Sequence, residues 1–220
     1  AMGLNDVGQL GDGTTTSRTS PVVIASDVLS VTAGFDHTLF VKTDGTLMAT
    51  GQNDFGQLGN GTTIAQGAPV QIDTDVAAAS AGGWHSFYIK ADGTLMAMGY
   101  NDFGQLGDGT VFDELTPVVI DSNVIDATVG AAFSLYLKEN RTLMAMGGNT
   151  YGQFGNGTTL NRVLPEAVDV GVDKISAGGW HSLYVKAPVQ TVQVGASGGN
   201  SSISYQADAS WTAASYDAWI

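Results

Sequence analysis

An internal repeat restricts what this chain can fold into more than any other feature of its sequence. Pro21, Pro69, Pro117 and Pro165 follow one another at intervals of 48 residues (69 − 21), and asparagine and lysine residues keep the same interval in all four units. No insertion breaks this register over residues 1–187. Self-similarity with a period of roughly 20–50 residues is typical of solenoids and propellers. We therefore expect a fold built from four like units.

Each unit contains four short apolar runs, and the third unit shows them clearly. They are PVVI (117–120), VIDATVG (124–130), FSLYLK (133–138) and TLMAMG (142–147). Runs of this length, rich in β-branched and aromatic residues and bounded by turn residues, indicate strands rather than an amphipathic helix. Four strands in a unit of about 40–50 residues are typical of one β-propeller blade. The predicted fold class is all-β: four four-stranded propeller repeats, in a closed small ring or as part of a larger ring.

The last two strands of a unit are expected to form a tight hairpin. Asp44-Gly45 and Asp92-Gly93 separate these strands in the first two units, and the glycine suits a turn that needs positive φ. In the third unit Asn140-Arg141 occupies this place, so Arg141 must adopt a positive φ or the turn must change type. We expect this hairpin to be the least regular.

Similar glycine-rich segments occur in all four units. They are NDVGQLGDG (5–13), NDFGQLGNG (53–61), NDFGQLGDG (101–109) and NTYGQFGNG (149–157). These segments resemble the signature of the regulator of chromosome condensation repeat family, and the resemblance covers residues 1–187. It implies a β-propeller, usually of seven blades. It implies less about function, because family members include a nucleotide exchange factor for a small GTPase, a secreted β-lactamase inhibitor and surface proteins.

The two ends of the repeat region correspond to each other. Ala1-Met2-Gly3 matches the end of a third strand, whereas the last unit stops after its second strand, at Ala187. A propeller commonly closes when its amino-terminal strand completes the last blade. We therefore expect a small closed ring, a fragment of a larger ring, or blades shared between chains. The alternative is that the first residues are a cloning remnant or an arbitrary cut.

Residues 188–220 no longer follow the repeat and are predicted to form a second module. VQTVQV and SISYQA alternate like strands, and SWTAAS and DAWI resemble the first half of a Bacteroidetes-associated carbohydrate-binding (BACON) domain, an immunoglobulin-like sandwich. This segment is shorter than the roughly 40 residues that an independent core needs. We expect it to pack on the propeller or on a neighbouring chain, or to belong to a longer polypeptide. Trp211 and Trp219 are interpreted as sandwich core rather than as sugar-stacking platforms.

Three histidines occupy equivalent positions in the repeat. They are His37, His85 and His181, and Phe133 takes this position in the third unit. Convergent imidazoles could hold a metal, but Phe133 interrupts the set and no carboxylate accompanies each histidine. We favour the alternative that each histidine joins its strand to the neighbouring unit through hydrogen bonds. No metal and no other cofactor is predicted.

The asparagine- and aspartate-rich loops contain oxygen donors at spacings loosely like those of calcium loops. Asn53-Asp54 with Asn60 is one example, and Asn101-Asp102 with Asp108 is another. They lack the full acidic series and the bidentate glutamate of such loops, and their glycines suit turns of positive φ. The glutamines are expected to hydrogen-bond loop backbone, because a buried amide needs partners. The signature residues interpreted as structural are Gly56, Gln57, Gly59, Gly104, Gln105, Gly107, Gly152, Gln153 and Gly155.

The sequence offers no credible catalytic constellation. Serine follows histidine in Trp84-His85-Ser86 and in Trp180-His181-Ser182, but consecutive side chains of a strand point to opposite faces, which separates the two groups. The glycine-rich segments also lack the lysine and the strand-to-helix setting of a phosphate-binding loop. We therefore expect a protein that is not an enzyme.

Charge and composition narrow the classes of partner. The chain has 21 acidic and 8 basic residues, a net charge of −13, and such a surface repels nucleic-acid phosphates and anionic membranes. No apolar run reaches the roughly 18 residues of a membrane-spanning helix. The absence of cysteine excludes disulfides and thiolate metal sites. We expect neither nucleic acid binding nor membrane insertion.

The leading functional hypothesis is an extracellular or surface-displayed bacterial scaffold that binds a protein partner or copies of itself, as an adhesin or filament subunit. Recognition is expected where the repeats diverge, in residues 14–20, 62–68, 111–115 and 158–164. A carbohydrate-binding module is one alternative, and an exchange factor or enzyme inhibitor, by family resemblance alone, is another. The candidate binding residues are Trp84, His85, Trp180, His181 and His37.

Overall fold

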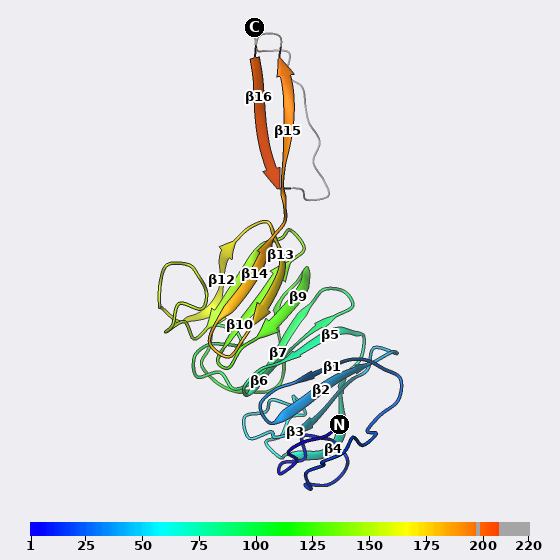
Figure 1. Cartoon of the computed structure of the whole chain (residues 1–220). Coiled ribbons are helices and arrows are strands. Elements are labelled where there is room, and N and C mark those ends of the chain that lie inside the picture. Colours follow the sequence, from blue (N-terminus) through cyan, green and yellow to red (C-terminus); the bar gives the residue numbers. More distant parts are fainter. Residues whose placement is uncertain (197–198, 207–220) are drawn as a thin grey trace.

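The computed structural model describes residues 1–196 and 199–206, with side chains described for residues 1–188. The described chain is all-β, as predicted, and its strands form antiparallel sheets whose order follows the sequence (Figure 1). The first sheet contains β1 (Val28–Ala33), β2 (His37–Lys42), β3 (Leu47–Gly51) and β4 (Gln66–Asp73). The second contains β5 (Val76–Ala81), β6 (His85–Lys90), β7 (Leu95–Gly99) and β8 (Glu114–Asp121). The third contains β9 (Val124–Val129), β10 (Phe133–Lys138), β11 (Leu143–Gly147) and β12 (Arg162–Asp169).

These sheets are successive propeller blades. Their first strands, β1, β5 and β9, contact one another in turn, and β9 contacts β13 (Val172–Ala177), so these strands lie innermost. Their fourth strands lie outermost. Within the described residues β13 pairs only with β14 (Ser182–Lys186), so the fourth predicted blade is represented there by its inner two strands, which we name the C-terminal half-blade.

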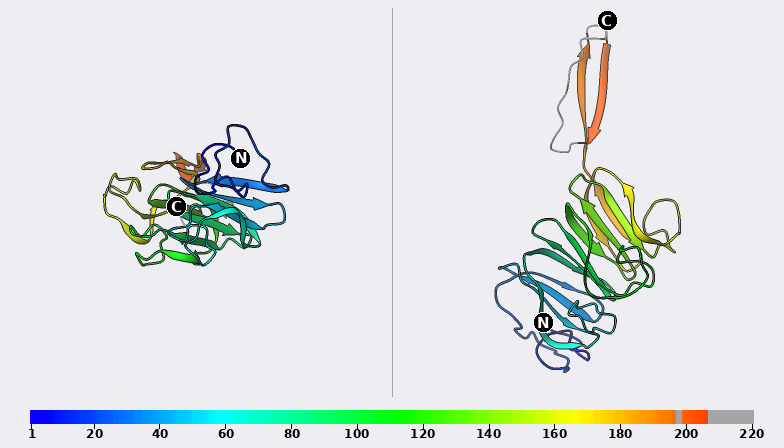
Figure 2. Two further views of the ribbon diagram at one scale, coloured as in Figure 1. Left: turned by 90° about the horizontal axis from the view of Figure 1, so that it is seen from below. Right: turned by 180° about the vertical axis from the view of Figure 1, so that it is seen from behind.

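The beginning of the chain supplies the outer half of another blade. Gly3 and Arg18 form an antiparallel bridge, with Gly3 N donating to Arg18 O at 2.8 Å. The ammonium group of Ala1 donates to Val22 O at 2.7 Å, and Val22 N donates to Ala1 O at 2.9 Å. We name residues 1–25 the N-terminal half-blade. The two half-blades lie at opposite ends of the stack of blades, so the described chain is an open arc rather than a small closed ring (Figures 1 and 2).

Apolar cores lie between successive blades. In the first of them, Leu39 and Val41 of β2 are fully buried and share a cluster with Val76 of β5 and Tyr88 of β6. The second and third cores repeat this arrangement one blade further along. Burying a side chain of this size stabilises the fold by roughly 1.5–3 kcal/mol. Each blade is therefore held mainly by the blades on either side of it.

The predicted hairpins are present, and the expected irregularity of the third is wrong. Gly45 and Gly93 have φ of 81° and 83°, and Arg141 has a φ of 66°, the awkward conformation expected for it. The hairpin of β10 and β11 nevertheless keeps the register of the other two. The reason is that Arg141 N donates to Lys138 O at 2.9 Å, as the glycines do in their turns, and its guanidinium is 2.7 Å from a carboxylate oxygen of Asp173.

The segment after the blades contains β15 (Val189–Ala196) and β16 (Gly199–Gln206), an antiparallel pair of strands. The strands predicted at VQTVQV and SISYQA are thus confirmed. Trp211 and Trp219 lie outside the described residues. Across the described part of the chain, no helix has the length and apolarity required to cross a membrane.

Candidate interaction site

Two kinds of connection meet at one end of the blades. The long loops between third and fourth strands and the short links between first and second strands both leave the sheets there, because neighbouring strands are antiparallel. The tight hairpins between second and third strands lie at the other end. We name the first end the long-loop face. Its loops comprise residues 4–17, 52–65, 100–113 and 148–161, and its links comprise residues 34–36, 82–84, 130–132 and 178–181.

A buried asparagine organises each long loop. Asn53 Oδ1 accepts a hydrogen bond from Leu58 N at 3.0 Å, and Asn53 Nδ2 donates to Thr62 O at 2.8 Å. Gln57 Oε1 accepts from Phe55 N at 3.0 Å, which confirms that this amide bonds loop backbone. The same pattern recurs in the other three loops. The aromatic residue at the position of Phe55 is therefore carried on a loop whose backbone is fixed from inside.

Five aromatic rings from two adjacent blades form a continuous cluster on the long-loop face. Trp84 is the centre: its ring centroid lies 5.3 Å from that of Phe35, 6.3 Å from Phe55 and 6.0 Å from Tyr100. Phe55 lies 4.9 Å from Tyr100, and Phe103 lies 6.3 Å from Tyr100 on its other side. The cluster is open to solvent, since Phe35 is 56% and Phe103 39% exposed. We name these five residues the aromatic rim.

A smaller aromatic pair lies further along the arc. Tyr151 and Trp180 are 72% and 52% exposed, and their ring centroids are 5.8 Å apart. Ala132 and Gly148 hold the places in the third blade that Trp84 and Tyr100 hold in the second. These small residues separate the pair from the aromatic rim.

The long-loop face is acidic. Tyr100 donates its hydroxyl to Asp102 at 3.0 Å, and burial together with this carboxylate raises the pKa of Tyr100 to about 12. Burial also raises the pKa of Asp113, and Asp102 beside it raises it further. The two arginines near the long loops, Arg18 and Arg162, already pair with acidic side chains. The long-loop carboxylates are those of Asp6, Asp12, Asp54, Asp102, Asp108 and Asp113.

The lysines lie at the other end of the blades. Lys42, Lys90 and Lys138 are the last residues of β2, β6 and β10, next to the hairpins, and Lys186 is the last residue of β14. Lys90 Nζ is 2.9 Å from a carboxylate oxygen of Asp73, and Lys138 makes the equivalent pair with Asp121. The long loops contain no lysine, whereas at the hairpin end lysines and acidic side chains such as Asp75, Asp92 and Glu139 occur together.

Two of the candidate histidines are buried ties between blades. His37 Nε2 lies 2.8 Å from Ser86 Oγ, and Ser86 Oγ lies 2.8 Å from Gln57 O. Because the single hydroxyl hydrogen goes to the carbonyl, the histidine must donate its Nε2–H to the serine oxygen. His85 and Ser134 repeat this arrangement at 2.9 Å. The hydrogen-bond interpretation of these histidines is confirmed.

In this geometry the histidine does not activate the serine hydroxyl as a nucleophile. A general base must accept the hydroxyl proton, whereas His37 Nε2 donates. Burial lowers the pKa of His37 to about 4 and that of His85 to about 3, so both rings are neutral. A Cβ on Gly34 would lie 2.3 Å from His37 Cε1, which explains why a glycine precedes this ring.

The remaining candidates are distributed over different surfaces. Trp84 lies half-buried in the aromatic rim, whereas Trp180 and His181 are exposed at the end of the arc. The divergent loops are exposed, and Ile64, Phe112 and Leu160 project from equivalent positions in them. Among residues 1–188 no group of three or more histidine or acidic side chains is arranged for a metal ion.

Of the five residues in the aromatic rim, Trp84 alone was predicted from the sequence as a binding residue. A usable signal existed, because aromatic residues recur at one loop position, as Phe55, Phe103 and Tyr151. The contact of these rings with Phe35, Trp84 and Tyr100 was not predictable from the repeat alone. It depends on how far one blade is rotated from the next.

Comparisons with known proteins agree with this architecture. Solved structures that resemble the chain include human WBSCR16, at 18% identity and a TM-score of 0.62, covering 83% of this chain and 66% of that one. Prp20p from Saccharomyces cerevisiae, described for its binding properties to Gsp1p and histones, gives 18% identity and a TM-score of 0.65, covering 72% and 43%. Yeast RCC1 (Prp20), solved bound to Kap60, gives 18% and 0.74, covering 85% and 50%. The chain therefore spans about half to two thirds of the length of these proteins.

The sequence comparisons are more specific about family. A search of curated proteins gave no match. The model of the regulator of chromosome condensation (RCC1) repeat matches residues 1–41, 44–89, 92–137 and 142–185, and a second model of this repeat matches 28–57 and 76–105. These matches end before residue 188, and they give the BACON-like resemblance of the tail no support. Since the matched segments make up most of the sequence, the chain belongs to the regulator of chromosome condensation (RCC1) repeat family.

Proposed function

We propose that this chain is a non-enzymatic scaffold that binds a protein partner through the aromatic rim of its long-loop face. The observation that carries the proposal is the cluster of five contacting aromatic rings held on internally bonded loops. Tryptophan and tyrosine are enriched among the residues that dominate binding energy at protein interfaces. A rim fixed in advance also loses little conformational entropy on binding.

The negative charge of the long-loop face favours a positively charged partner. Carboxylates surround the rim, and the lysines lie at the opposite end of the blades. Such a field accelerates the approach of a positively charged partner. Arginine and lysine side chains also bind favourably over aromatic rings, most strongly over tryptophan. The preferred partner is therefore a protein segment that combines basic and apolar side chains.

The neighbouring structures support protein binding as the general role. Yeast RCC1 was solved bound to Kap60, and Prp20p was described for binding Gsp1p and histones. Those partners belong to those proteins, of which this chain spans about half. Nothing in the geometry of the rim favours nucleotide exchange or enzyme inhibition over simple binding.

Two variants test the rim against a matched control. Phe103 and Phe112 belong to the same long loop, and both are exposed, but only Phe103 lies in the rim. We expect Phe103→Ala to weaken binding of a basic, apolar peptide by about tenfold or more, the range of an interface hot spot, while Phe112→Ala leaves it unchanged. Fluorescence anisotropy with labelled Arg/Leu-rich and Glu/Leu-rich peptides measures both effects. Equal losses for the two variants, or preference for the acidic peptide, would contradict the proposal.

Carbohydrate binding is a second candidate, carried by Trp180. Its ring is 52% exposed, and the ring of Tyr151 meets it edge to face at 75°. The Trp180 ring, supported in this way, can stack on a sugar while the Tyr151 hydroxyl hydrogen-bonds the same sugar. If this candidate is right, hits on a glycan array disappear for Trp180→Ala and remain for Phe103→Ala. An array without hits removes it.

The proposal also includes a location outside the cell or on its surface, as expected for a bacterial adhesin or filament subunit. Antibody labelling of intact producing cells tests this location. Self-association would make such a subunit multivalent.

A further inference from the structure

Two carboxylates flank Tyr100 in the aromatic rim. Tyr100 donates its hydroxyl to Asp102 at 3.0 Å. Burial, Asp102 and Asp113 together raise the pKa of Tyr100, so the carboxylate of Asp113 lies near the same hydroxyl. Within residues 1–188 neither carboxylate forms an ion pair. We name Asp102 and Asp113 the acidic pair.

The fold does not require the negative charge of Asp113. Asp113 Oδ1 accepts a hydrogen bond from Asn101 N at 2.8 Å, a contact between the two ends of the long loop. In the first and fourth long loops the equivalent bond is accepted by Ser17 Oγ, at 3.2 Å, and by Asn161 Oδ1, at 2.8 Å. An uncharged side chain therefore makes the same contact. The charge also has a cost, because Asp102, in addition to burial, raises the pKa of Asp113.

The carboxylate of Asp102 is bonded at the rim although a buried donor of the same loop lacks a partner. In the first long loop Gln9 Nε2 donates to Asp6 at 3.1 Å. Gln105 and Asp102 are the repeat equivalents of these residues. Gln105 is completely buried, and its Nε2 has no hydrogen-bond partner among the described residues. Since an unpaired buried donor is unfavourable, the loop loses an internal hydrogen bond where Asp102 bonds Tyr100 instead.

Aromatic rings lie beside the acidic pair. Tyr100 contacts Asp102 directly, and the ring centroid of Phe103 lies 6.3 Å from that of Tyr100. Carboxylates and aromatic faces both attract a cation. A guanidinium can use both at once, because its planar fork pairs with carboxylate oxygens and also stacks on a ring, whereas the ammonium of lysine is a compact point charge. The acidic pair and the ring of Tyr100 therefore suit arginine better than lysine.

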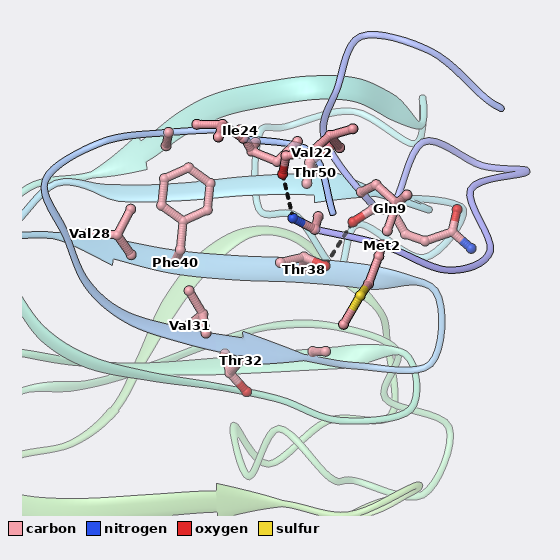
Figure 3. Close-up of a pocket in the computed structure, with 15 residues that line it drawn as sticks. Met2, Gln9, Val22, Ile24, Val28, Val31, Thr32, Thr38, Phe40 and Thr50 are labelled. Carbon is pink, nitrogen blue, oxygen red and sulfur yellow. Dashed lines mark hydrogen bonds between the residues drawn. The ribbon is translucent and has the colours of Figure 1, made fainter. Parts of the chain in front are cut away.

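The pocket between the N-terminal half-blade and the first blade offers a cation no comparable site (Figure 3). It has a volume of about 600 Å³, and the described residues that line it include no acidic side chain. The hydroxyl of Thr38 in its wall already donates to Gln9 O at 2.8 Å. Apolar side chains such as Phe40 and Val31 form most of the remaining wall. A positively charged side chain is therefore favoured on the long-loop face over this pocket.

We propose that the acidic pair binds one arginine side chain of the protein partner at the aromatic rim. The guanidinium donates to the carboxylate oxygens of Asp102 and Asp113 and lies against the ring of Tyr100. This inference rests on the proposed function and names the contact that determines its specificity. The occupant is an arginine because two carboxylates without an ion pair adjoin an aromatic ring, and because neither the charge of Asp113 nor the orientation of Asp102 is explained by the structure of the loop.

Three peptides that differ at one residue test the arginine contact. A peptide of leucine and serine contains a single arginine, lysine or citrulline, where lysine keeps the charge and citrulline keeps the planar shape without the charge. We expect the full chain to bind the arginine peptide at least about tenfold more tightly than the citrulline peptide, the contribution of a hydrogen bond to a charged group. The lysine peptide should lie between them. Fluorescence anisotropy measures all three affinities.

Asp113→Asn removes the charge and keeps the loop, because asparagine already fills this position as Asn161. We expect this variant to melt no lower than the unmodified chain. Its affinity for the arginine peptide should fall by about tenfold, and its preference for arginine over lysine should disappear.

Asp54→Asn is the matched control. It removes the same charge from the loop position that corresponds to Asp102 in the preceding blade, where Ala65 takes the place of the second acidic residue. We expect this variant to weaken the arginine and lysine peptides equally, by about twofold, as an exposed charge does. The preference for arginine should remain.

The arginine contact is wrong if the unmodified chain binds the arginine and lysine peptides equally, or if Asp113→Asn keeps the preference for arginine. Phe103→Ala separates this inference from the proposed function. Binding that depends on Phe103 but does not distinguish arginine from lysine defeats only the arginine contact. A preference for arginine that depends on Asp113 in a chain unaffected by Phe103→Ala defeats only the aromatic rim. A chain that binds none of the peptides defeats both.

Discussion

At the scale of single residues, the buried histidines show how the blades are held in register. Each ring fills space that a glycine leaves open and donates to a serine of the next blade. Phe133 fills the equivalent space in the third blade without donating. A ring is therefore present at each of the three described junctions, and its hydrogen bond to serine at two of them.

The buried histidines make stability depend on pH. Their pKa values are lowered in the folded state, to about 4 for His37 and about 3 for His85, from 6.5. The unfolded chain thus binds protons first as pH falls, so the stability is complete above pH 6.5 and is lost progressively from there toward pH 4. For His37 the loss amounts to about 3 kcal/mol, at 1.36 kcal/mol per pKa unit. Thermal melts between pH 7 and pH 4.5 should show a falling Tm.

Phenylalanine substitutions identify the source of that dependence. His37→Phe with His85→Phe should flatten the decline, because Phe133 shows that the site accepts this ring. His181→Phe, which changes the exposed histidine, should leave it unchanged. A decline that persists in the double variant would assign it to other groups.

At the scale of structural elements, the hairpin of β10 and β11 contains a non-glycine residue of positive φ that an ion pair stabilises. Arg141 adopts positive φ, at a cost of roughly 1–2 kcal/mol for a non-glycine residue. Its contact with Asp173 offsets part of this cost. At the matching place of the second blade the partner would be Ile125, which offers no charge.

Arginine should therefore destabilise the hairpin of β6 and β7, although it is tolerated in the hairpin of β10 and β11. We expect Gly93→Arg to lower the free energy of unfolding by about 1–2 kcal/mol, the cost of the left-handed conformation without a compensating ion pair. Ala91→Arg, in the same turn at ordinary φ, should change it by less than about 0.5 kcal/mol, as surface substitutions usually do. Urea titrations of both variants measure the difference. Equal losses would show that φ is not the cause.

At the scale of the whole molecule, the repeat made the blades predictable but not their closure. Strand boundaries, the glutamine contacts and the histidine ties follow from local pattern and from the fact that each unit meets an identical neighbour. The aromatic rim could not be predicted, because Phe35, Trp84 and Phe103 come from three connections whose relative position depends on blade rotation. The incomplete units at residues 1–25 and 172–187 were predicted, but the choice between a closed small ring and an open arc was not, since the sequence of a unit does not state how many units complete a turn.

The apolar cores between successive blades also determine the order in which the blades unfold. In the part of the chain that the structure describes, the sheet of β5–β8 packs against a blade on each side, whereas β13 and β14 pack against one neighbouring blade. In a molecule whose units support only those beside them, resistance to opening is graded along its length. On heating or proteolysis, the sheet of β5–β8 should accordingly be the last of the described blades to unfold.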